Sequence, residues 1–289
     1  PEVGDISANL SVKNFLDPEI NLQMTSNFQL PFLADFFNLR DLADMQGEIE
    51  LEMNFHDIID FTNPQHAISK LNESYYTKLD VRDLSFTTSK MPVPIKDVDI
   101  HAELNGHEAT INYCNLVVGS SDVSISGSID DLPAIIHHTD KLVDTRLKIE
   151  SKLLDFHELT KGDSAAFDEQ ITDFKMDLDF KSSARAITES PSLPVGEFFI
   201  ENLHAQLKHY PHEFHDFHAD IIIEEDNMKL IDFKGMVDET DFLFTGGIEH
   251  YSMWFTEHPV GDTKIDFDLN SKLIRLEDVF SYKGANYVP

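Results

Sequence analysis

Hydrophobic and polar residues alternate along most of this chain with a period of two. Clear examples are the segments 97–104, 122–129, 174–180 and 265–269. Successive side chains of a β-strand point to opposite faces of the sheet, so each of these segments predicts a strand with one apolar and one polar face. The alternation is frequent enough to predict an all-β fold with few helices.

Two segments break the alternation in the same way. Arg82-Asp83 and Glu201-Asn202 each place two adjacent polar residues where the pattern expects one. An extra residue in one strand is typical of a β-bulge, which bends the strand and sharpens its twist. We therefore predict a bulge at the same place in two related strands.

Turn signals separate the alternating segments. Asn105-Gly106 lies between two of them and is a strong hairpin signal. The segments 119–122 and 238–241 are predicted to form the next turns.

The chain also resembles itself. At an offset of 119 residues, 81–84 matches 200–203 and 121–129 matches 240–248. Strands nearer the start match at an offset of 125, which places 49–55 on 174–180. A long internal period predicts an array of similar units that stack along one axis.

The repeat predicts three parts. Residues 1–46 are the tail of a preceding unit, 47–170 form one β-repeat unit, and 171–289 form a second, with about six strands in each unit. We expect an elongated, curved antiparallel sheet built from repeats of about 120 residues.

Helical patterns are short. The segments 30–45, 153–159 and 164–171 have mixed apolar spacing and are predicted to be short connecting helices. The segment 182–194 is rich in Ser and Pro and is predicted to be a loose linker, with 63–72 as its counterpart in the earlier unit.

Composition narrows the function. The chain has 289 residues, 41% of them hydrophobic, so it can build a core. Its net charge of −31 argues against binding to nucleic acid or to anionic membrane surfaces, which both need basic patches. Cys114 is the single cysteine, which excludes an intramolecular disulfide. No apolar run reaches the length of a membrane span.

Signals for catalysis are absent, so we predict a non-enzymatic protein without a cofactor or a physiological metal site. The chain has no nucleophile elbow, phosphate-binding loop or dinucleotide fingerprint. His209, His212, His215 and His218 lie three residues apart. On a strand this spacing alternates faces, so a polar strand face or adventitious metal binding explains the four better than a built site.

A sheet with one apolar face must roll up, take a second layer or enclose something apolar. The few predicted connectors cannot cover about a dozen strands, so an open groove for acyl chains is the favoured outcome. The predicted lining is Ile49, Leu51, Met53, Val98, Ile100, Leu104, Val123, Ile125, Ile129, Leu147, Ile149, Phe174, Met176, Leu178, Ile221, Ile223, Phe242, Phe244, Ile265 and Phe267.

From residue 104 to 159 the chain resembles the C-terminal region of the AsmA family of bacterial envelope proteins. The resemblance is carried by 115–129, with a Gly-x-Ser-Asp turn and a strand that ends Gly-x-Ile, and by 147–159, with Ser-x-x-Leu-Asp. The second unit departs from the pattern at Asp238, which replaces Gly119, and keeps the later glycine as Gly246.

The resemblance implies a β-groove related to TamB-like and repeating-β-groove lipid-transfer proteins. It implies a periplasmic protein, tethered to the inner membrane, that transports phospholipid or maintains the outer membrane. The expected partners are phospholipid acyl chains and envelope proteins at the ends of the groove, with membrane contact through segments outside this chain.

Two other classes stay open. A structural or adhesive β-repeat module with a closed core would serve as a spacer or docking surface. A carbohydrate-active β-solenoid would need clustered surface aromatics, and Trp254 is the only tryptophan.

Overall fold

The computed structural model describes residues 4–13, 19–31, 42–58, 75–88, 93–136, 138–159, 169–190, 193–210, 212–255 and 261–277. By its internal contacts the chain divides into two units. The first comprises residues 1–133 and 158–166, and the second 134–157 and 167–289.

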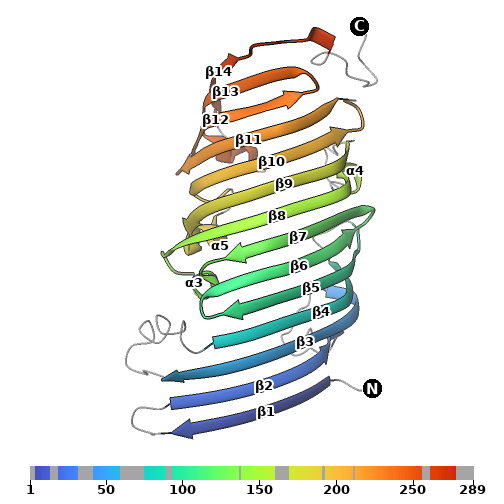
Figure 1. Ribbon diagram of the computed structural model, residues 1–289, viewed down its shortest axis with the longest axis vertical. Helices are drawn as coiled ribbons and strands as arrows, with labels where there is room; N and C mark the ends of the chain where they lie inside the picture. Colours follow the sequence, from blue (N-terminus) through green and yellow to red (C-terminus); the bar gives the residue numbers. More distant parts are fainter. Residues whose placement is uncertain are drawn as a thin grey trace. The chain divides into compact units, whose positions relative to one another are not determined.

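Strands dominate both units (Figure 1). The first unit contains β1 (Gly4–Lys13), β2 (Glu19–Gln29), β3 (Leu42–Ile58), β4 (Tyr75–Thr88), β5 (Ile95–Asn105), β6 (Glu108–Val118) and β7 (Ser121–Ile129). The second contains β8 (Leu142–Asp155), β9 (Gln170–Ser183), β10 (Gly196–Leu207), β11 (Glu213–Glu224), β12 (Asn227–Val237), β13 (Thr240–Glu249) and β14 (Lys264–Asn270). The helices that lie wholly within the described residues are α3 (Leu132–Ile136), α4 (Phe156–Leu159), α5 (Ala184–Glu189) and the 3-10 helix η2 (Tyr251–Phe255).

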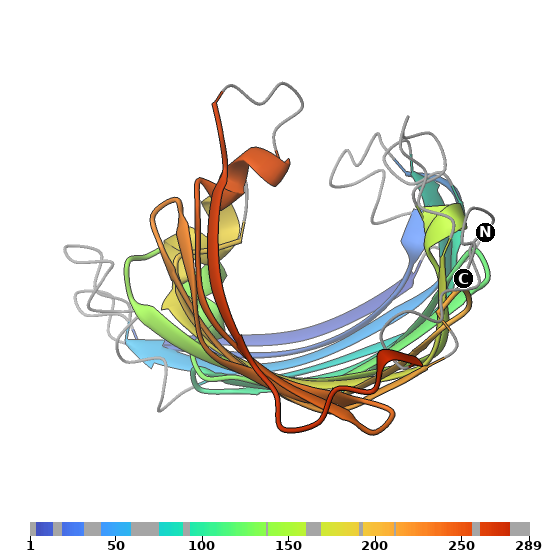
Figure 2. The same cartoon turned by 90° about the horizontal axis from the view of Figure 1, so that it is seen from above.

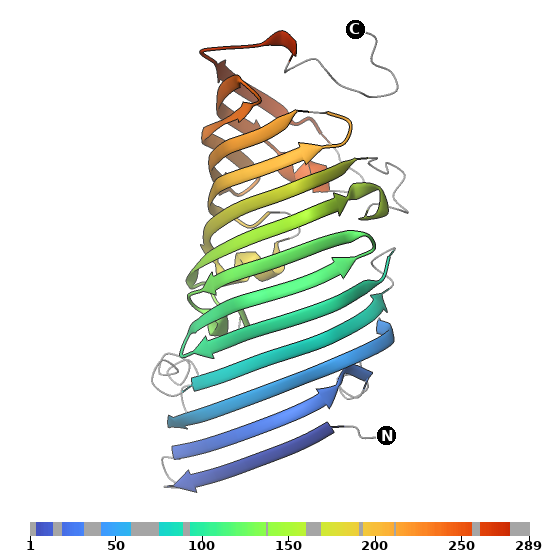
Figure 3. The same cartoon turned by 45° about the vertical axis from the view of Figure 1, so that its right-hand side comes forward.

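In each unit the strands follow one another in sequence order, and each is antiparallel to the next. Figure 3 shows this succession of strands for the first unit. The strands of each unit bend into an arc that is open on one side (Figure 2). The predicted fold class, an antiparallel β-protein with a curved sheet and a few short connecting helices, is confirmed.

The predicted bulges are confirmed. The register between β4 and β5 shifts between Val81 and Leu84, and that between β10 and β11 shifts between Ile200 and Leu203. At these bulges Asp83 has a φ of 51°. Asn202 has a φ of 54°. Asp and Asn tolerate this left-handed conformation better than other side chains, so they mark where the extra residue can sit.

Four further residues extend the bulges to the neighbouring strands. Asp44 in β3 and Asp97 in β5 have positive φ in the first unit, and Asp173 in β9 and Asp216 in β11 do so in the second. Each lies in or beside a register shift. Three adjacent strands in each unit therefore bend at the same level, which contributes to the arc.

The repeat also reappears in hydrogen bonds. The backbone N–H of Gly119 donates to the carbonyl of Pro94 over 3.1 Å, and that of Asp238 donates to the carbonyl of Glu213 over 3.0 Å. Both donors and both acceptors are 119 residues apart, and both donors follow the last residue of a strand. Asp238 thus replaces Gly119 in the same turn, with φ values of 49° and 62°.

The offset of 125 predicted for the earlier strands is wrong. Val81 pairs with Ile49, and Ile200, which lies 119 residues after Val81, pairs with Leu178. Leu178 is therefore the counterpart of Ile49, at an offset of 129. Ile49 also pairs with Phe28, and Leu178 with Leu147, so β2 and β8 match at 119. Six strands, β2–β7, correspond to β8–β13.

The structure corrects parts of three predicted connectors. In the segment 30–45, Leu30 and Pro31 are helical and residues 42–45 belong to β3, and in the segment 164–171, Gln170 and Ile171 begin β9. Residues 32–41 and 164–168 lie outside the described residues. The predicted linker 182–194 contains α5, whose N-cap Ser183 accepts a hydrogen bond from the N–H of Ala186. The predicted helix at the end of β8 is shorter and is α4. The hairpin at Asn105-Gly106 is confirmed, and 63–72 lies outside the described residues.

The boundaries of the predicted parts, 1–46, 47–170 and 171–289, stay a prediction. The contacts divide the chain at other residues, since a boundary between repeats and a boundary between compact units are different properties. A run of similar strands can be cut into repeats at any of them.

Candidate functional site

One face of each unit is built from uncharged rows that run across the strands. In an antiparallel sheet, directly paired residues share a face. The central row of the first unit is Phe28, Ile49, Val81, Ile100, Cys114 and Ile125. The corresponding row of the second unit is Leu147, Leu178, Ile200, Ala219, Phe233, Phe244 and Leu269.

The 3-10 helix η2 shows which side of the second unit this apolar face occupies. Tyr251 of η2 is fully buried against Ile223 and Ile248, which belong to another row of the same face. Figure 2 shows η2 inside the arc of the strands. The uncharged rows of the second unit therefore line the concave side of the sheet, and we call this surface the apolar face.

The opposite face is charged. In the second unit a row there contains Arg146, Asp179, Phe199, Asp220 and Asp232. In the first unit Glu50 pairs with Asp80 and Asp80 with His101 in the same way. Ion pairs two residues apart along a strand, such as Lys148 with Glu150 at 3.0 Å, occur on this face. The acidity of the chain is thus concentrated away from the apolar face.

The structure brings the twenty residues of the predicted lining onto the apolar faces of the two units. Their exposure differs. Val98, Leu104 and Ile223 are buried, whereas Ile265 and Phe267 on the edge strand β14 are 54% and 40% exposed. Most of the others lie between these limits. Their contact with a lipid stays a prediction.

Sequence reasoning missed several members of the same rows. The missed residues that the pairing places there include Leu79, Val81, Leu84, Phe198, Ile200, Leu230 and Phe233. Most of them flank a bulge, where the alternation changes phase. At the bulges in β4 and β10 the available signal was the pair of adjacent polar residues, which shows where to restart the alternation. The bulge between Leu230 and Phe233 contains Ile231 and Asp232 and gives no such signal.

Aromatic rings form a continuous track on the apolar face of the second unit. Phe217 of β11 lies with its ring centroid 5.8 Å from that of Phe233 and 5.2 Å from that of Phe242. Phe242 and Phe244 are 5.3 Å apart, and Phe244 is 6.4 Å from Phe267. Tilted and edge-on rings at these separations attract each other beyond their burial. The track crosses the four strands β11–β14.

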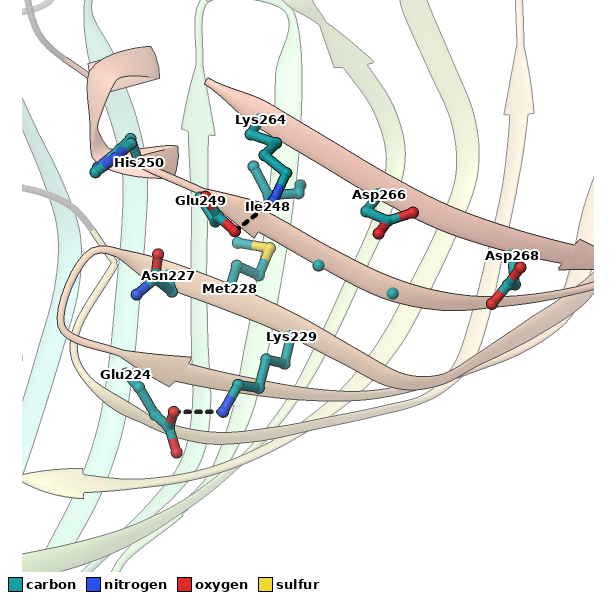
Figure 4. A pocket seen from close by; sticks show the side chains of 12 residues that line it. Glu224, Asn227, Met228, Lys229, Ile248, Glu249, His250, Lys264, Asp266 and Asp268 are labelled. Carbon is teal, nitrogen blue, oxygen red and sulfur yellow. Dashed lines mark hydrogen bonds and ion pairs between the residues drawn. The ribbon is translucent and has the colours of Figure 1, made fainter. Parts of the chain in front are cut away.

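A hollow of about 700 Å³ lies at the β12–β14 end of the second unit (Figure 4). Both lysines that line it form ion pairs with glutamates, Lys229 with Glu224 at 2.5 Å and Lys264 with Glu249 at 2.9 Å. Asp266 and further polar groups line the rest together with Met228 and Ile248. Charged and polar side chains make up most of the lining besides Met228 and Ile248, and we assign this hollow no ligand.

The histidines of 209–218 are dispersed among carboxylates. His212 contacts Asp238, and His215 contacts Asp216 at 2.9 Å. His209 lies 3.4 Å from Glu169, and His218 lies 3.7 Å from Glu201. Across the part of the chain that the structure describes, no group of three or more His, Cys, Asp or Glu is placed to hold a metal ion.

Two of these contacts shift pKa values. Burial alone would lower the pKa of His215, but hydrogen bonds to the carbonyl of Asp238 and the carboxylate of Asp216 outweigh it, so the net pKa is raised. Burial would raise the pKa of Asp238, and hydrogen bonds from the Glu213 N–H and from His212 lower it overall. A proton on His215 is therefore favoured by folding, and its contribution is lost as the pH rises through its raised pKa.

Cys114 lies in the central row of the first unit, between Ile100 and Ile125. Burial raises the pKa of its thiol, so less of it is present as the reactive thiolate. The position fits a small apolar side chain better than a nucleophile.

One His–Asp pair of the first unit recurs in the second unit with its two members exchanged. In the first unit His107 Nδ1 lies 3.0 Å from Asp131 Oδ2. In the second, His250 Nδ1 lies 2.9 Å from Asp226 Oδ2. Asp226 follows His107 by 119 residues, and His250 follows Asp131 by the same number. Each pair joins the hairpin turn of two strands to the start of the helical turn after a third.

A backbone bond repeats at the same place. The N–H of Leu132 donates to the carbonyl of His107 over 3.0 Å, and the N–H of Tyr251 donates to that of Asp226 over 3.2 Å. The first pair is nearly buried, with side chains 10% and 4% exposed, whereas those of the second are 58% and 42% exposed.

We expect His107→Ala to lower the free energy of unfolding by about 2 kcal/mol, because it leaves the buried Asp131 carboxylate without this partner. The matched variant His250→Ala should change it by less than about 0.5 kcal/mol, because solvent replaces an exposed partner. Urea unfolding of both variants measures the difference. Equal losses would show that the burial of the pair does not decide its contribution.

Neither a protein-family model, nor a curated protein, nor a solved structure matches this chain. Among the described residues, no helix combines the length and the apolar character needed to cross a membrane.

Proposed function

We propose that this protein binds the acyl chains of phospholipids along its apolar faces and lets them move there without catalysis. The observation that carries the proposal is the curved sheet with an uncharged concave side and a charged reverse side. Phe244 and Leu269 belong to a row of the concave side, and Leu269 is 53% exposed. A monomeric protein that leaves a contiguous apolar surface accessible usually uses it for binding.

Acyl chains suit this surface because they carry no charge and no hydrogen-bonding group. Each methylene removed from water gains about 0.8 kcal/mol. A chain that covers about ten methylenes against the apolar face would therefore gain several kcal/mol before the cost of its ordering. Lipid headgroups would remain in water at the open side of the arc.

The resemblance of residues 115–129 and 147–159 to the AsmA family supports the same proposal from the sequence. We therefore propose a place in the bacterial envelope, in the periplasm and tethered to the inner membrane by segments outside this chain. The role would be phospholipid transport or maintenance of the outer membrane, with envelope proteins at the ends of the groove as partners.

Native mass spectrometry of the protein, expressed in bacteria and purified without detergent, tests the proposal. We expect phospholipid masses bound to the wild-type protein. Phe244→Glu should lose at least about 80% of the bound lipid, because it places a charge in contact with the tails. Leu243→Glu is the matched control and should keep it, because Leu243 is on the reverse face, paired with Lys234. Circular dichroism verifies that both variants fold.

A second function is favoured by the burial of Val98 and Ile223. Where the apolar face is covered by the protein's own side chains, it acts as a core, and the protein would be a β-repeat spacer or docking module. Wild-type protein that carries no lipid from cells, and takes none from vesicles, would support this second function and contradict the first.

A further inference from the structure

The two apolar faces are built from different side chains at corresponding positions. In the second unit Phe214, Phe217, Phe233, Phe242 and Phe244 form a set that we call the phenylalanine floor. The residues 119 positions earlier in the first unit are Ile95, Val98, Cys114, Val123 and Ile125. None of these five is aromatic, so the same rows carry rings in one unit and smaller side chains in the other.

The correspondence rests on pairing as well as on numbering. Phe233 pairs with Phe244 in the second unit, and Cys114 pairs with Ile125 in the first. Phe214 and Phe217 lie with ring centroids 5.8 Å apart, and Phe217 contacts Phe233 and Phe242. The five rings are therefore in mutual contact and hold one another in place.

A floor of rings should retain an acyl chain better than a floor of shorter side chains. A phenylalanine offers more apolar area than valine or cysteine and has only two side-chain torsions to fix. Rings that are already packed together lose little further freedom when a ligand covers them. At the corresponding positions of the first unit, the smaller side chains offer less apolar area for contact with an acyl chain.

The chemistry of the floor selects a lipid tail over a peptide. An extended peptide laid across these rings would leave its N–H and C=O groups without partners, at a cost of a few kcal/mol for each pair. The phenylalanine floor has no donor or acceptor in its side chains and no charge. A hydrocarbon tail meets this surface without any unsatisfied polar group.

We infer that the phenylalanine floor is the high-affinity holding site for the acyl tail of a phospholipid, and that the first unit's apolar face binds tails more weakly. The inference rests on the proposed function and assigns the strongest binding to one of two related surfaces.

Site-specific photo-crosslinking at corresponding positions tests the inference. The photoreactive amino acid p-benzoyl-phenylalanine replaces Phe244 in one variant and Ile125 in another. Leu243, on the reverse face, is the background position. Each full-length protein is mixed with vesicles of phosphatidylethanolamine and phosphatidylglycerol in a ratio of about three to one, irradiated, and weighed intact by mass spectrometry. We expect at least about five times more lipid adduct at position 244 than at position 125, and background at 243.

A second measurement avoids the bulky photoreactive group. The triple variant Phe233→Cys, Phe242→Val and Phe244→Ile gives three of the five positions of the phenylalanine floor the side chains of the first unit. Its affinity for the fluorescent fatty acid cis-parinaric acid should fall about tenfold, with the far-ultraviolet circular dichroism unchanged. The matched change of Cys114, Val123 and Ile125 to Phe should raise the affinity.

The outcomes separate two failures. Adduct at position 125 that equals or exceeds that at 244, or a triple variant with unchanged affinity, would overturn the assignment of the holding site while lipid binding stands. Adduct at neither position above the background at 243 would overturn the proposed function itself and the inference with it.

Discussion

Gly235→Leu should destabilise the second unit by about 3 kcal/mol, and adding Phe217→Val, which is destabilising by itself, should cause no further loss. Gly235 lies under the ring of Phe217, so that a Cβ atom there would come within 2.8 Å of the ring carbons. Phe217 is buried and is held by neighbouring rings on both sides. The ring cannot turn away, so a larger residue at position 235 overpacks the site.

The first unit already contains the proposed solution. The residues 119 positions before Phe217 and Gly235 are Val98 and Leu116, which pack in one hydrophobic cluster. The second unit thus combines a large side chain, Phe217, with a glycine, whereas the first unit fills the corresponding space with two side chains of medium size. The double variant gives the second unit the pair that the first unit uses.

A double-mutant cycle measured by urea unfolding tests this account. Phe217→Val alone should cost about 2 kcal/mol, because it leaves a cavity above Gly235. If the two sites share one space, the double variant should be more stable than the sum of the single losses predicts, by at least about 2 kcal/mol. If the two single losses add up to the loss of the double variant within about 0.5 kcal/mol, the side chains at positions 217 and 235 do not share one space.

Much of the fold could be predicted from the sequence because strands have a period of two. The alternation gave the fold class, and the paired polar residues at Arg82-Asp83 and Glu201-Asn202 gave the bulges. The hairpin at Asn105-Gly106 could be predicted from these two residues alone. Each of these signals comes from a short stretch of sequence, so it can be recognised without knowing which strands pair.

The same period explains the wrong offset between the earlier strands. The structure pairs Ile49 with Val81 and Leu178 with Ile200, which requires an offset of 129 where 125 was predicted. The two offsets differ by an even number, so both keep apolar residues on one face. Only an odd slip reverses the faces and would have been visible in the pattern.

Contact pairs whose two residues are exchanged between the units could not be found by aligning the sequence with itself. His107 aligns with Asp226 and Asp131 with His250, and each alignment alone is a mismatch. The same holds for Phe217 and Gly235 of the second unit, which correspond to Val98 and Leu116 of the first. In both cases the two units share a contact between two segments while the residues that make it differ, and the contact is visible only when the partners are known.

The sequence could show which residues of the candidate site share one side of the sheet, but it could not show how exposed each of them is. Alternation identified which residues share a side, including Ile125 and Phe244. It could not show that Val98 is buried while Phe267 is 40% exposed, because exposure depends on curvature, on neighbouring rings and on η2. The lateral contacts of the phenylalanine floor likewise join rings from three strands, β11, β12 and β13, and alternation within one strand does not show which residues of its neighbours lie beside them.

Gly246→Ala should detach the edge strand β14 from β13, with a local loss of about 3 kcal/mol or more. Gly246 has a φ of 151°, which L-residues rarely adopt. A Cβ atom there would also lie 2.1 Å from the backbone oxygen of Asp266 and 2.7 Å from the ring of Phe267. The backbone of β14 must move to relieve this contact. Gly127, its counterpart in the first unit, has the same φ.

The adjacent glycine provides the matched control. Gly247 has an ordinary φ, and the nearest atom to a Cβ built there is the carbonyl oxygen of Met228 at 3.3 Å. Gly247→Ala should therefore change stability by less than about 1 kcal/mol. Both variants add one methyl group to the same strand, so any difference between them comes from backbone conformation and from the approach of β14.

Hydrogen–deuterium exchange of peptides that cover Lys264–Asn270 measures the effect directly. In Gly246→Ala these amides should exchange at least about a hundredfold faster than in the wild type, because the hydrogen bonds between β13 and β14 open locally. Peptides from β8 and β9 should keep their protection in the same sample. Equal exchange of Lys264–Asn270 in the Gly246→Ala and Gly247→Ala proteins would show that the backbone at Gly246 does not hold β14 in place.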